Sequence, residues 1–571
     1  MNYQEAYAAW KRDFAQDEAM QAELNAIAAD EKEIEDRFYT ELSFGTGGMR
    51  GVLGAGTNRM NIYNIRKATK GLADYINKID GATARGVVVA YDSRRMSAEF
   101  AKETALVLAA SGVKALLFPS LRPVPVLSFA VRYLGATAGV VITASHNPPQ
   151  YNGYKVYWED GAQMPPDRAD AVLSLIRNRS YLACEPMEEG QALSQKLLSY
   201  VGPEVDDAYN ERVKTLCVQP ALLREHGHDL KIIYTPLHGS GNVPVRRVLS
   251  ELGVANLLVV PEQESPDGNF PTIQVPNPEE PDTFRLAIAL ANQEGADTCF
   301  ATDPDCDRLG VAMRGPDGNF VLLTGNQIGC LLLYYVLASR AEAGTLPGNA
   351  AVVKSIVSTE LATAIAAHFG VAVIDTLTGF KFIAEQIQRF EETGEHTFIF
   401  GFEESFGYLS STFVRDKDAV NASLLVTELV LSLKLQGKTL WDLLEEIYRQ
   451  FGFAAERVIS ITLPGKDGVT RMGEIMQALR TAPPTAIGGH TVTAVRDYST
   501  GLRRDAAGSK PMGLPASDVL YFELDGGNWM CVRPSGTEPK VKLYVNTVST
   551  SQAGADDLAS RIGADAKALL Q

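Results

Sequence analysis

The sequence predicts an α/β protein of several domains, with a smaller α+β domain at its C-terminal end. The chain has 571 residues, enough for about three or four domains, and its 46% apolar content supports packed cores. Up to about residue 451, short apolar runs typical of buried strands alternate with helical segments, which is the pattern of parallel sheets. From residue 452, several strands follow one another, which predicts an antiparallel α+β domain.

Charge and cysteine content exclude several classes of protein. The 53 basic and 69 acidic residues give a net charge of −16, which argues against a nucleic-acid-binding surface but allows a local basic cluster for small anions. The six cysteines form no C-x-x-C pair, which indicates buried thiols in a reducing compartment. The amino terminus lacks a signal-peptide pattern, and no apolar run approaches 18 residues. We therefore expect a cytoplasmic monomer or homodimer that binds neither nucleic acid nor membrane.

The N-terminal segment is predicted to be a helical arm packed on the first domain. Residues 4–38 are rich in Ala, Glu, Gln and Lys and contain no Gly or Pro, so we expect one or two amphipathic helices there. The predicted boundaries are 1–40 for the arm, 41–205, 206–321 and 322–451 for three α/β domains, and 452–571 for the α+β domain.

The first α/β domain begins its alternation with strand 86–91 and helix 97–110. A polar turn that contains Asp92 and Arg94 connects the two. We interpret Asp92 and Arg94 as structural rather than catalytic residues.

A serine loop follows the apolar strand 138–142. Asn152-Gly153 is a loop signal, so Ser145 is expected on a loop at the carboxyl end of a strand, where open α/β sheets bind ligands. A hydroxyl in this place, with Lys155 ten residues later, suggests a nucleophile that handles phosphate. A turn-forming serine is one alternative. A Ser145-His146 hydrolase pair is another, although the G-x-S-x-G elbow is missing.

Two further loops could hold phosphate. The glycine-rich turn Phe44–Gly51 would let backbone N–H groups approach an anion, and the Arg50 guanidinium could donate two hydrogen bonds to it. The turn fits neither the P-loop nor the dinucleotide fingerprint. The loop Arg533–Lys540 combines an arginine, two hydroxyls and a glycine, which makes a compact phosphate cradle. A hairpin turn is its alternative interpretation.

Three carboxylates at alternate positions predict a metal site. Asp303, Asp305 and Asp307 follow a strand and can converge on one hard cation, because oxygen ligands suit Mg²⁺ or Ca²⁺. An EF-hand is excluded, because Arg308 stands inside its pattern and the twelfth-position glutamate is missing. A solvated acidic turn is the remaining alternative.

The third domain offers groups for a sugar. Strand 397–400 opens onto a loop where Glu403 and Ser405 lie close together, which suits hydrogen bonds to neighbouring sugar hydroxyls. The charged run 415–418 follows, and composition alone suggests a solvated surface. In the last domain, we expect helix 467–480, a final helix from about 552, and strands near 490–497, 518–525, 528–532 and 540–547.

These loops, taken in order, resemble the motifs of the α-D-phosphohexomutases, the phosphoglucomutase and phosphomannomutase superfamily. The resemblance covers the glycine-rich turn, the serine loop, the aspartates, the Gly401–Tyr408 loop and the Arg533–Lys540 loop, and leaves out only the helical arm. It implies three related α/β domains and a smaller α+β domain around a central cleft. No fixed-period repeat in the sequence supports the three-fold relation.

The resemblance also implies the chemistry. The family's serine carries a phosphoryl group, so Ser145 would exchange phosphate with a hexose monophosphate through a bisphosphate. It implies Mg²⁺, with glucose 1,6-bisphosphate as primer, and these metal ligands: Ser145, Asp303, Asp305 and Asp307. It implies catalytic roles for Ser145, Lys155, Arg50, Lys381 and Arg308. It implies substrate contacts from His146, Glu403, Ser405, Thr378, Gly379, Arg533, Ser535, Gly536 and Thr537. Whether Lys155 or Lys381 transfers the proton stays open.

The expected substrate is a small sugar phosphate. The Glu403–Gly407 loop and the run 415–418 resemble the phosphoglucomutase branch, which implies interconversion of glucose 1-phosphate and glucose 6-phosphate. A phosphopentomutase or phosphomannomutase is the alternative. A non-catalytic sugar-phosphate-binding protein would typically have lost Ser145 or one of the aspartates, and all are present. A phosphohydrolase, in which water takes the phosphoryl group, is the last alternative.

Overall fold

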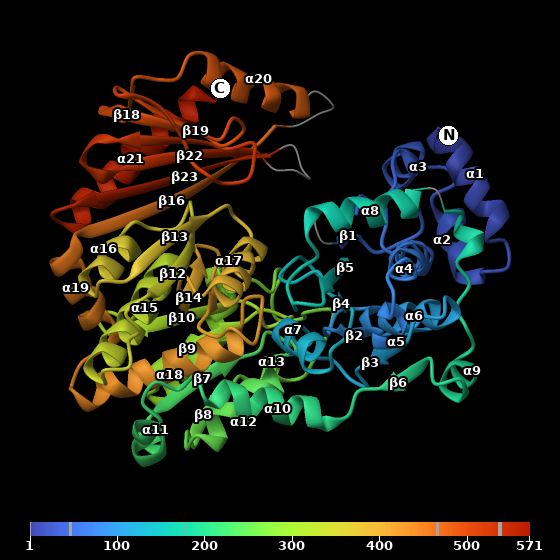
Figure 1. The fold of residues 1–571 in the computed structure, drawn as a ribbon, viewed down its shortest axis with the longest axis horizontal. Helices are drawn as coiled ribbons and strands as arrows, with labels where there is room; N and C mark the ends of the chain where they lie inside the picture. The colour runs from blue at the N-terminus through green and yellow to red at the C-terminus, as the bar shows by residue number, and fades with distance from the viewer. Residues whose placement is uncertain (1, 45–47, 178, 464–467, 535–539, 571) are drawn as a thin grey trace. The chain divides into compact units, whose positions relative to one another are not determined.

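The computed structural model describes residues 2–44, 48–177, 179–463, 468–534 and 540–570 (Figure 1). The chain divides into two compact units. The first comprises Met1–Ile328, Ala384–Gly401 and Ser405–Gly437, and the second comprises Gly329–Ile383, Phe402–Glu404 and Lys438–Gln571. Each unit is described by itself.

The N-terminal arm forms three helices, where the sequence predicted one or two: α1 (Tyr3–Asp13), α2 (Glu18–Ala26) and α3 (Glu31–Phe38). Each helix begins at a side-chain cap, because Asn2, Asp17 and Asp30 each accept a hydrogen bond from an amide three residues later. Because each cap starts a new helix, the arm forms three short helices. These helices pack as a small cluster around buried Trp10 and Phe38.

The first sheet has the strand order β1-β5-β4-β2-β3-β6. Its strands are β1 (Gly48–Val52), β2 (Val87–Tyr91), β3 (Ala115–Leu117), β4 (Ala138–Ile142), β5 (Tyr151–Trp158) and β6 (Leu198–Tyr200). Strands β4, β2, β3 and β6 are parallel, and β5 runs antiparallel to both of its neighbours, β4 and β1. The predicted strands 86–91 and 138–142 and the predicted helix 97–110 are confirmed.

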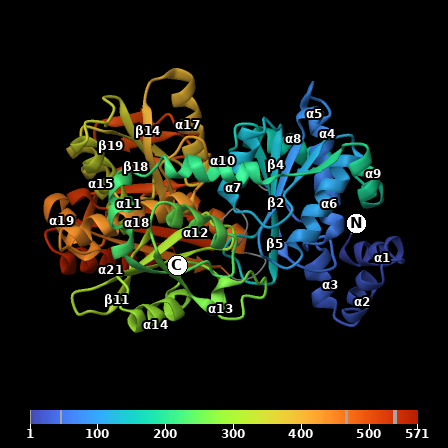
Figure 2. The ribbon, with the colours of Figure 1, turned by 90° about the horizontal axis from the view of Figure 1, so that it is seen from below.

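Helices cover both faces of the first sheet (Figure 2). They are α4 (Ile62–Ile76), α5 (Ala82–Arg85), α6 (Ser97–Ala110), α7 (Val124–Tyr133), α8 (Pro166–Arg177) and α9 (Glu189–Ser194). Helices α4, α6 and α8 share one apolar core with the sheet, whereas α7 packs on the other face against Gly139.

The loop interpretation of Asn152-Gly153 is wrong, because both residues lie inside β5. A Cβ at Gly153 would lie 2.4 Å from the carbonyl oxygen of Thr143, so this glycine permits close strand contact rather than a turn. The antiparallel return from β4 to β5 therefore places Lys155 back beside the serine loop.

The second sheet, also in the first unit, has the order β11-β10-β9-β7-β8. Its strands are β7 (Lys231–Thr235), β8 (Asn256–Val259), β9 (Thr298–Thr302), β10 (Leu309–Arg314) and β11 (Phe320–Leu322). Its helices and 3₁₀ turns include α10 (Pro203–Lys214), α11 (Pro220–His226), η2 (Gly227–Asp229), α12 (Asn242–Glu251), α13 (Pro261–Glu264), η3 (Pro281–Phe284), α14 (Arg285–Glu294) and α18 (Ala419–Leu435). Strands β9 and β10 are antiparallel, so the three aspartates lie on the loop that joins them.

The division into units passes through the third block. Its elements are α15 (Gly325–Glu342), β12 (Ala350–Ser355), α16 (Leu361–His368), β13 (Ala372–Thr376), α17 (Phe380–Thr393), β14 (Thr397–Glu403), β15 (Gly407–Leu409) and α19 (Leu440–Phe451). Within the second unit, β12 pairs in parallel with β13, as the alternation predicted. Among the described residues, no single helix is long and apolar enough to cross a membrane, whereas the bent pair α18 and α19 together meets that test by length and composition.

The last block is an eight-stranded sheet in the order β16-β23-β22-β21-β18-β19-β20, with β17 paired to β18. Its strands are β16 (Phe453–Thr462), β17 (Ala486–Ile487), β18 (His490–Asp497), β19 (Leu502–Asp505), β20 (Gly508–Pro511), β21 (Leu520–Leu524), β22 (Trp529–Pro534) and β23 (Lys540–Ser549). Its helices are α20 (Gly468–Thr481) and α21 (Gln552–Leu569). The described strand pairs are antiparallel, which confirms the predicted antiparallel α+β domain. The sequence predicted only four of these strands.

Candidate active site

The loop after β4 holds Ser145 in a strained and buried position. Its φ of 52° lies in the left-handed region, and only 3% of the residue is exposed. The backbone N–H of Ser145 donates to Thr143 Oγ1 over 2.8 Å, and Thr143 Oγ1 donates to Asp92 Oδ2 over 2.6 Å. Strain that persists at a loop held this firmly is typical of a functional site.

Arg94 holds the same loop in place through hydrogen bonds to its backbone. Its guanidinium is fully buried and donates to the carbonyl oxygens of Ser145 (2.5 Å), Pro148 (2.9 Å), Tyr151 (3.1 Å) and Asn147. Asp92 lies 3.5 Å from it and offsets the charge. These contacts support the interpretation of Asp92 and Arg94 as structural residues. Together, the two side chains fix the backbone on both sides of Ser145.

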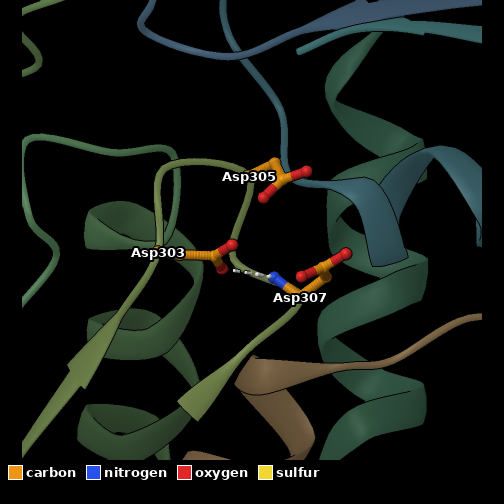
Figure 3. A group of neighbouring side chains, drawn as sticks. All are labelled: Asp303, Asp305 and Asp307. Atoms are coloured by element: carbon orange, nitrogen blue, oxygen red, sulfur yellow. Dashed lines mark hydrogen bonds between the residues drawn. The ribbon is translucent and has the colours of Figure 1, made fainter. Parts of the chain in front are cut away.

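Three carboxylates converge on the loop between β9 and β10 (Figure 3). Asp303 Oδ1 accepts hydrogen bonds from the backbone N–H groups of Asp307 (3.1 Å) and Arg308 (3.0 Å), and Cys306 adopts a positive φ of 52° that curls the loop. All three aspartates are buried, and one oxygen from each lies within 4.8 Å of the others. Ser145 Oγ donates to Asp303 Oδ2 over 2.7 Å. The serine and the carboxylates, far apart in sequence, thus form one cluster.

The chemistry of this cluster fits a hard divalent cation. Asp305 Oδ1 and Asp307 Oδ1 are buried and accept no hydrogen bond from the residues that the structure describes. Burying carboxylate oxygens without partners is costly unless a cation satisfies them. The solvated acidic turn is therefore wrong, since a solvated turn would expose these oxygens.

The three carboxyl groups differ in their proton affinity. Burial and the neighbouring Asp305 and Asp307 raise the pKa of Asp303 well above its ordinary value. Burial works in the same direction on Asp305, but the Lys155 ammonium, the hydrogen bond with Asp303 and the Lys417 ammonium together outweigh it and lower the pKa of Asp305. Burial, together with Asp305, raises the pKa of Asp307. A cation bound here would keep all three ionised.

Two lysines contact the carboxylates. Lys155 Nζ lies 2.9 Å from Asp305 Oδ2 and 3.9 Å from Asp307 Oδ2. Lys417 Nζ lies 3.1 Å from Asp307 Oδ2 and 3.0 Å from Asp416 Oδ1. Sequence reasoning missed Lys417 as a site residue.

The solvated interpretation of the run 415–418 is wrong, because all four residues are buried. Asp416 Oδ2 accepts hydrogen bonds from Tyr157 (2.7 Å) and Gln163 (3.1 Å), and Asp418 caps α18. The signal that could have found this is the apolar helix that follows directly, since a solvated run rarely leads into a helix buried along almost its whole length.

A pocket of about 280 Å³ opens onto Ser145. Its lining residues are Gly48, Met49, Arg50, Ser145, His146, Lys155, Gln163, Asp307, Arg308 and Lys417. Four of these carry positive charge and only Asp307 is acidic, so the pocket suits an anion.

The remaining pocket residues are oriented by contacts of their own. Arg50 NH1 donates to Asn147 Oδ1 over 2.9 Å, and Arg308 NH1 pairs with Glu279. His146 Nδ1 lies 3.1 Å from Ser145 Oγ. Burial and the nearby arginines hold the pKa of His146 well below its ordinary value, so its imidazole is neutral at pH 7.

The residues that were predicted to contact a sugar belong mostly to the second unit. Glu403 is buried, and its Oε1 accepts a hydrogen bond from the backbone N–H of Gly379 over 2.7 Å. Glu404 Oε2 accepts one from Ser355 Oγ over 3.0 Å, and Lys381 Nζ lies 5.1 Å from the centre of the Phe382 ring.

The structure thus brings one set of predicted residues together in the first unit: Ser145, His146, Lys155, Arg50, Arg308, Asp303, Asp305 and Asp307. Thr378, Gly379, Lys381, Glu403 and Arg533 lie in the second unit, and Ser405 begins a segment of the first. Ser535, Gly536 and Thr537 lie outside the described residues.

Comparison with known proteins places the chain in a family. It matches four phosphoglucomutase/phosphomannomutase domain families: alpha/beta/alpha domain I at residues 41–182, domain II at 207–317, domain III at 324–451 and the C-terminal domain at 501–562. It is similar to phosphoglucomutase of Staphylococcus aureus (strain USA300), with 38% identity over 545 residues that cover 94% of each chain.

Solved structures share the fold. One is a phosphoglucomutase/phosphomannomutase family protein from Burkholderia thailandensis, with a TM-score of 0.66, 21% identity, and coverage of 92% of this chain and 96% of the other. Another is the exocytosis-sensitive phosphoprotein parafusin, a phosphoglucomutase from Paramecium in its open form, with a TM-score of 0.68, 16% identity, and coverage of 93% and 95%.

Proposed function

The chain belongs to the phosphoglucomutase/phosphomannomutase family and is a mutase, and we propose that it interconverts glucose 1-phosphate and glucose 6-phosphate with Ser145 as the phosphoryl carrier. One observation carries the proposal: Ser145 Oγ lies 2.7 Å from a carboxylate of a buried three-aspartate cluster, in a pocket lined by four positively charged side chains. The 38% identity to a phosphoglucomutase over nearly the whole chain supports glucose as the sugar.

Mg²⁺ is the proposed metal. Asp303, Asp305 and Asp307 would hold it together with an oxygen of phosphorylated Ser145, since an all-oxygen donor set of this kind suits Mg²⁺. Bound there, the ion would neutralise charge on the phosphoryl group as it transfers. The two buried carboxylate oxygens without hydrogen-bond partners support this assignment.

In the proposed cycle, phosphorylated Ser145 gives its phosphoryl group to a free hydroxyl of the hexose monophosphate. The P–O bond to Ser145 breaks as a P–O bond to the sugar forms, and the hydroxyl proton passes to a base. The resulting bisphosphate turns over and returns its other phosphate to Ser145. Glucose 1,6-bisphosphate would prime the unphosphorylated enzyme.

The chain's own cations have distinct proposed roles. Arg50 and Arg308 line the pocket and would stabilise the charge of the transferring group. Lys155 and Lys417 lie 2.9 Å and 3.1 Å from aspartate oxygens, so each is placed to move a proton near Ser145. Lys381 keeps its proposed role as an alternative proton carrier.

Substrate recognition is proposed for two other groups of residues. His146, Thr378, Gly379, Glu403 and Ser405 would contact the sugar. Arg533, Ser535, Gly536 and Thr537 would hold the phosphate that does not react, and this grip must accept either end of the sugar because the bisphosphate turns over.

The proposed carrier role of Ser145 is tested by following the transfer of phosphate to a single serine. The protein is incubated with glucose 1,6-bisphosphate and Mg²⁺, and the phosphorylated residue is located by mass spectrometry. Ser145→Ala is expected to abolish both labelling and turnover. Ser93→Ala is the control, because Ser93 Oγ is buried on the neighbouring strand-end loop and makes no hydrogen bond to described residues. Turnover retained by Ser145→Ala refutes the carrier role.

A coupled assay then decides the sugar. Glucose, mannose and ribose 1-phosphates are compared under the same conditions, and glucose 1-phosphate is expected to show the highest kcat/KM. Phosphate released without a bisphosphate product would instead indicate a phosphohydrolase.

A further inference from the structure

A second cavity lies between the helical arm and the first α/β domain. Its volume is about 450 Å³, within the range of small-molecule sites, and it shares no lining residue with the Ser145 pocket. The proposed mutase mechanism makes no use of it.

Aromatic rings form much of the cavity. Trp10, Phe14 and Phe38 line it and belong to the buried core of the arm. Tyr39 and Leu182 also line it and are 63% and 53% exposed, although large apolar side chains are buried in most of the described chain. Apolar groups gathered at the mouth of a cavity mark a binding surface for a flat apolar group.

A buried ammonium lies in the same cavity. Lys67 is only 4% exposed, and its Nζ lies 4.4 Å from the centre of the Tyr181 ring. Nζ donates to both carboxylate oxygens of Glu41, over 2.8 Å and 2.9 Å, whereas the Glu41 side chain is 48% exposed. Because a half-exposed carboxylate is well solvated when it is released, another anion can replace it at low cost.

Two arginines also line the cavity. Arg179 pairs with Asp74, as the lining carboxylate of Asp13 pairs with Arg12, and Arg177 adds a further positive charge. The cavity therefore combines aromatic rings with positively charged side chains, which suits a ligand with a flat aromatic ring and a phosphate.

We propose that this cavity binds a nucleoside monophosphate, with the base against the rings and the phosphate in place of Glu41 at Lys67. The aromatic walls accept any base through stacking and edge contacts, and the lysine and arginines bind the phosphate as charge-assisted donors.

The site is connected to the Ser145 pocket through the backbone. Glu41 precedes Leu42, whose N–H donates to Thr57 O over 3.0 Å. The Leu42 side chain packs so closely on β1 that a Cβ at Gly51 would lie 2.8 Å from its Cδ2. A shift of the Glu41 backbone on ligand binding would pass through Leu42 to Gly51, the residue after Arg50. This step rests on the proposed function, whereas binding itself does not.

Binding is tested by calorimetry on the full-length protein. AMP is titrated, with adenosine and inorganic phosphate as its two halves. AMP is expected to bind at least about tenfold more tightly than either half, because the rings and the positively charged side chains both contribute. No measurable heat for AMP at millimolar concentration overturns the proposal.

Two variants at the ion pair give opposite predictions. Lys67→Met removes the cation, so AMP affinity falls at least about tenfold. Glu41→Gln removes the competing carboxylate, so AMP affinity rises. The control Lys102→Met changes an exposed lysine paired with Glu189 outside the cavity, and AMP affinity stays as in the wild type. AMP binding that Lys67→Met leaves unchanged would place AMP elsewhere, for example in the Ser145 pocket, and refutes the site.

The connection to turnover is a separate measurement. AMP is expected to lower kcat/KM for the sugar phosphate by about fivefold in the wild type and not in Lys67→Met. If the protein proves to lack mutase activity, the calorimetric result still stands or falls by itself.

Discussion

The grip of Arg94 on the serine loop predicts a large loss when that grip is removed. Arg94 donates to four backbone carbonyls around Ser145 from a fully buried position. Arg94→Met removes every one of these bonds and leaves Asp92 buried without its cation. Arg94→Lys keeps the charge for Asp92, but a single ammonium cannot reach four carbonyls.

The magnitude follows from the contacts. Hydrogen bonds from a charged donor contribute about 1.5–3 kcal/mol each, and loss of one partner of a buried ion pair costs about 3–5 kcal/mol. Because the loop can relax, we expect Arg94→Met to lower the local opening free energy by about 3–5 kcal/mol. Displacing Ser145 by about 1 Å costs roughly 100-fold in turnover.

The assay is hydrogen exchange of the amides in residues 143–154, together with kcat. A loss of about 3 kcal/mol accelerates exchange more than 100-fold, since each 1.4 kcal/mol is a factor of ten. Arg95→Met is the matched control, because Arg95 is exposed and, among the described residues, its side chain donates a single hydrogen bond, to Pro149 O over 3.2 Å. If Arg94→Lys exchanges and turns over like Arg95→Met, the reasoning is refuted.

Three further predictions concern the neighbouring network. Tyr157→Phe removes the 2.7 Å hydrogen bond to buried Asp416, so the free energy of unfolding is expected to fall by about 1–3 kcal/mol. The kcat is also expected to fall, because Asp416 orients Lys417. Unchanged denaturant unfolding and kcat would contradict this. Burial raises the pKa of Asp418 to about 6, so its neutral form stabilises the fold at low pH, and this stability is lost as pH rises through 6. Asp418→Asn is therefore expected to be more stable than the wild type by about 3 kcal/mol at pH 7.5 and not at pH 4, and parallel pH profiles of unfolding would exclude it. Chelation with EDTA is expected to abolish turnover and Mg²⁺ to restore it, with Asp305→Asn needing at least about tenfold more Mg²⁺ for half-maximal rate.

Most regular elements could be predicted from local pattern. Apolar runs such as 138–142 became strands, because a short continuous apolar run is typical of a strand buried on both faces. Helix 97–110 was predicted to the residue, because side-chain burial in helices repeats every 3.6 residues. Strand β5 was missed, because Asn152 and Gly153 are turn formers locally, and the glycine is explained by the Thr143 and Met49 carbonyl oxygens on the two neighbouring strand segments. Strands β19 and β20, the last two at one end of the C-terminal sheet, carry exposed or half-exposed residues and give a weak apolar signal.

The candidate site shows the same division. By itself, the sequence determined the residue types at the ends of strands: a serine after β4, three alternating aspartates after β9, and a lysine ten residues beyond the serine. It also determined the family, through loops in a fixed order. These features are local, since each depends on a strand ending and a polar loop beginning.

Only the tertiary structure decided which charges meet. It joined Ser145 to Asp303 across 158 positions and Lys155 to Asp305 across 150, and it buried Lys417 in what looked like a solvated run. It also enclosed Lys67 in a ring-lined cavity. The physical reason is that the energy of a charge depends on its partners and its exposure to water, and both are set by long-range packing rather than by the neighbouring sequence.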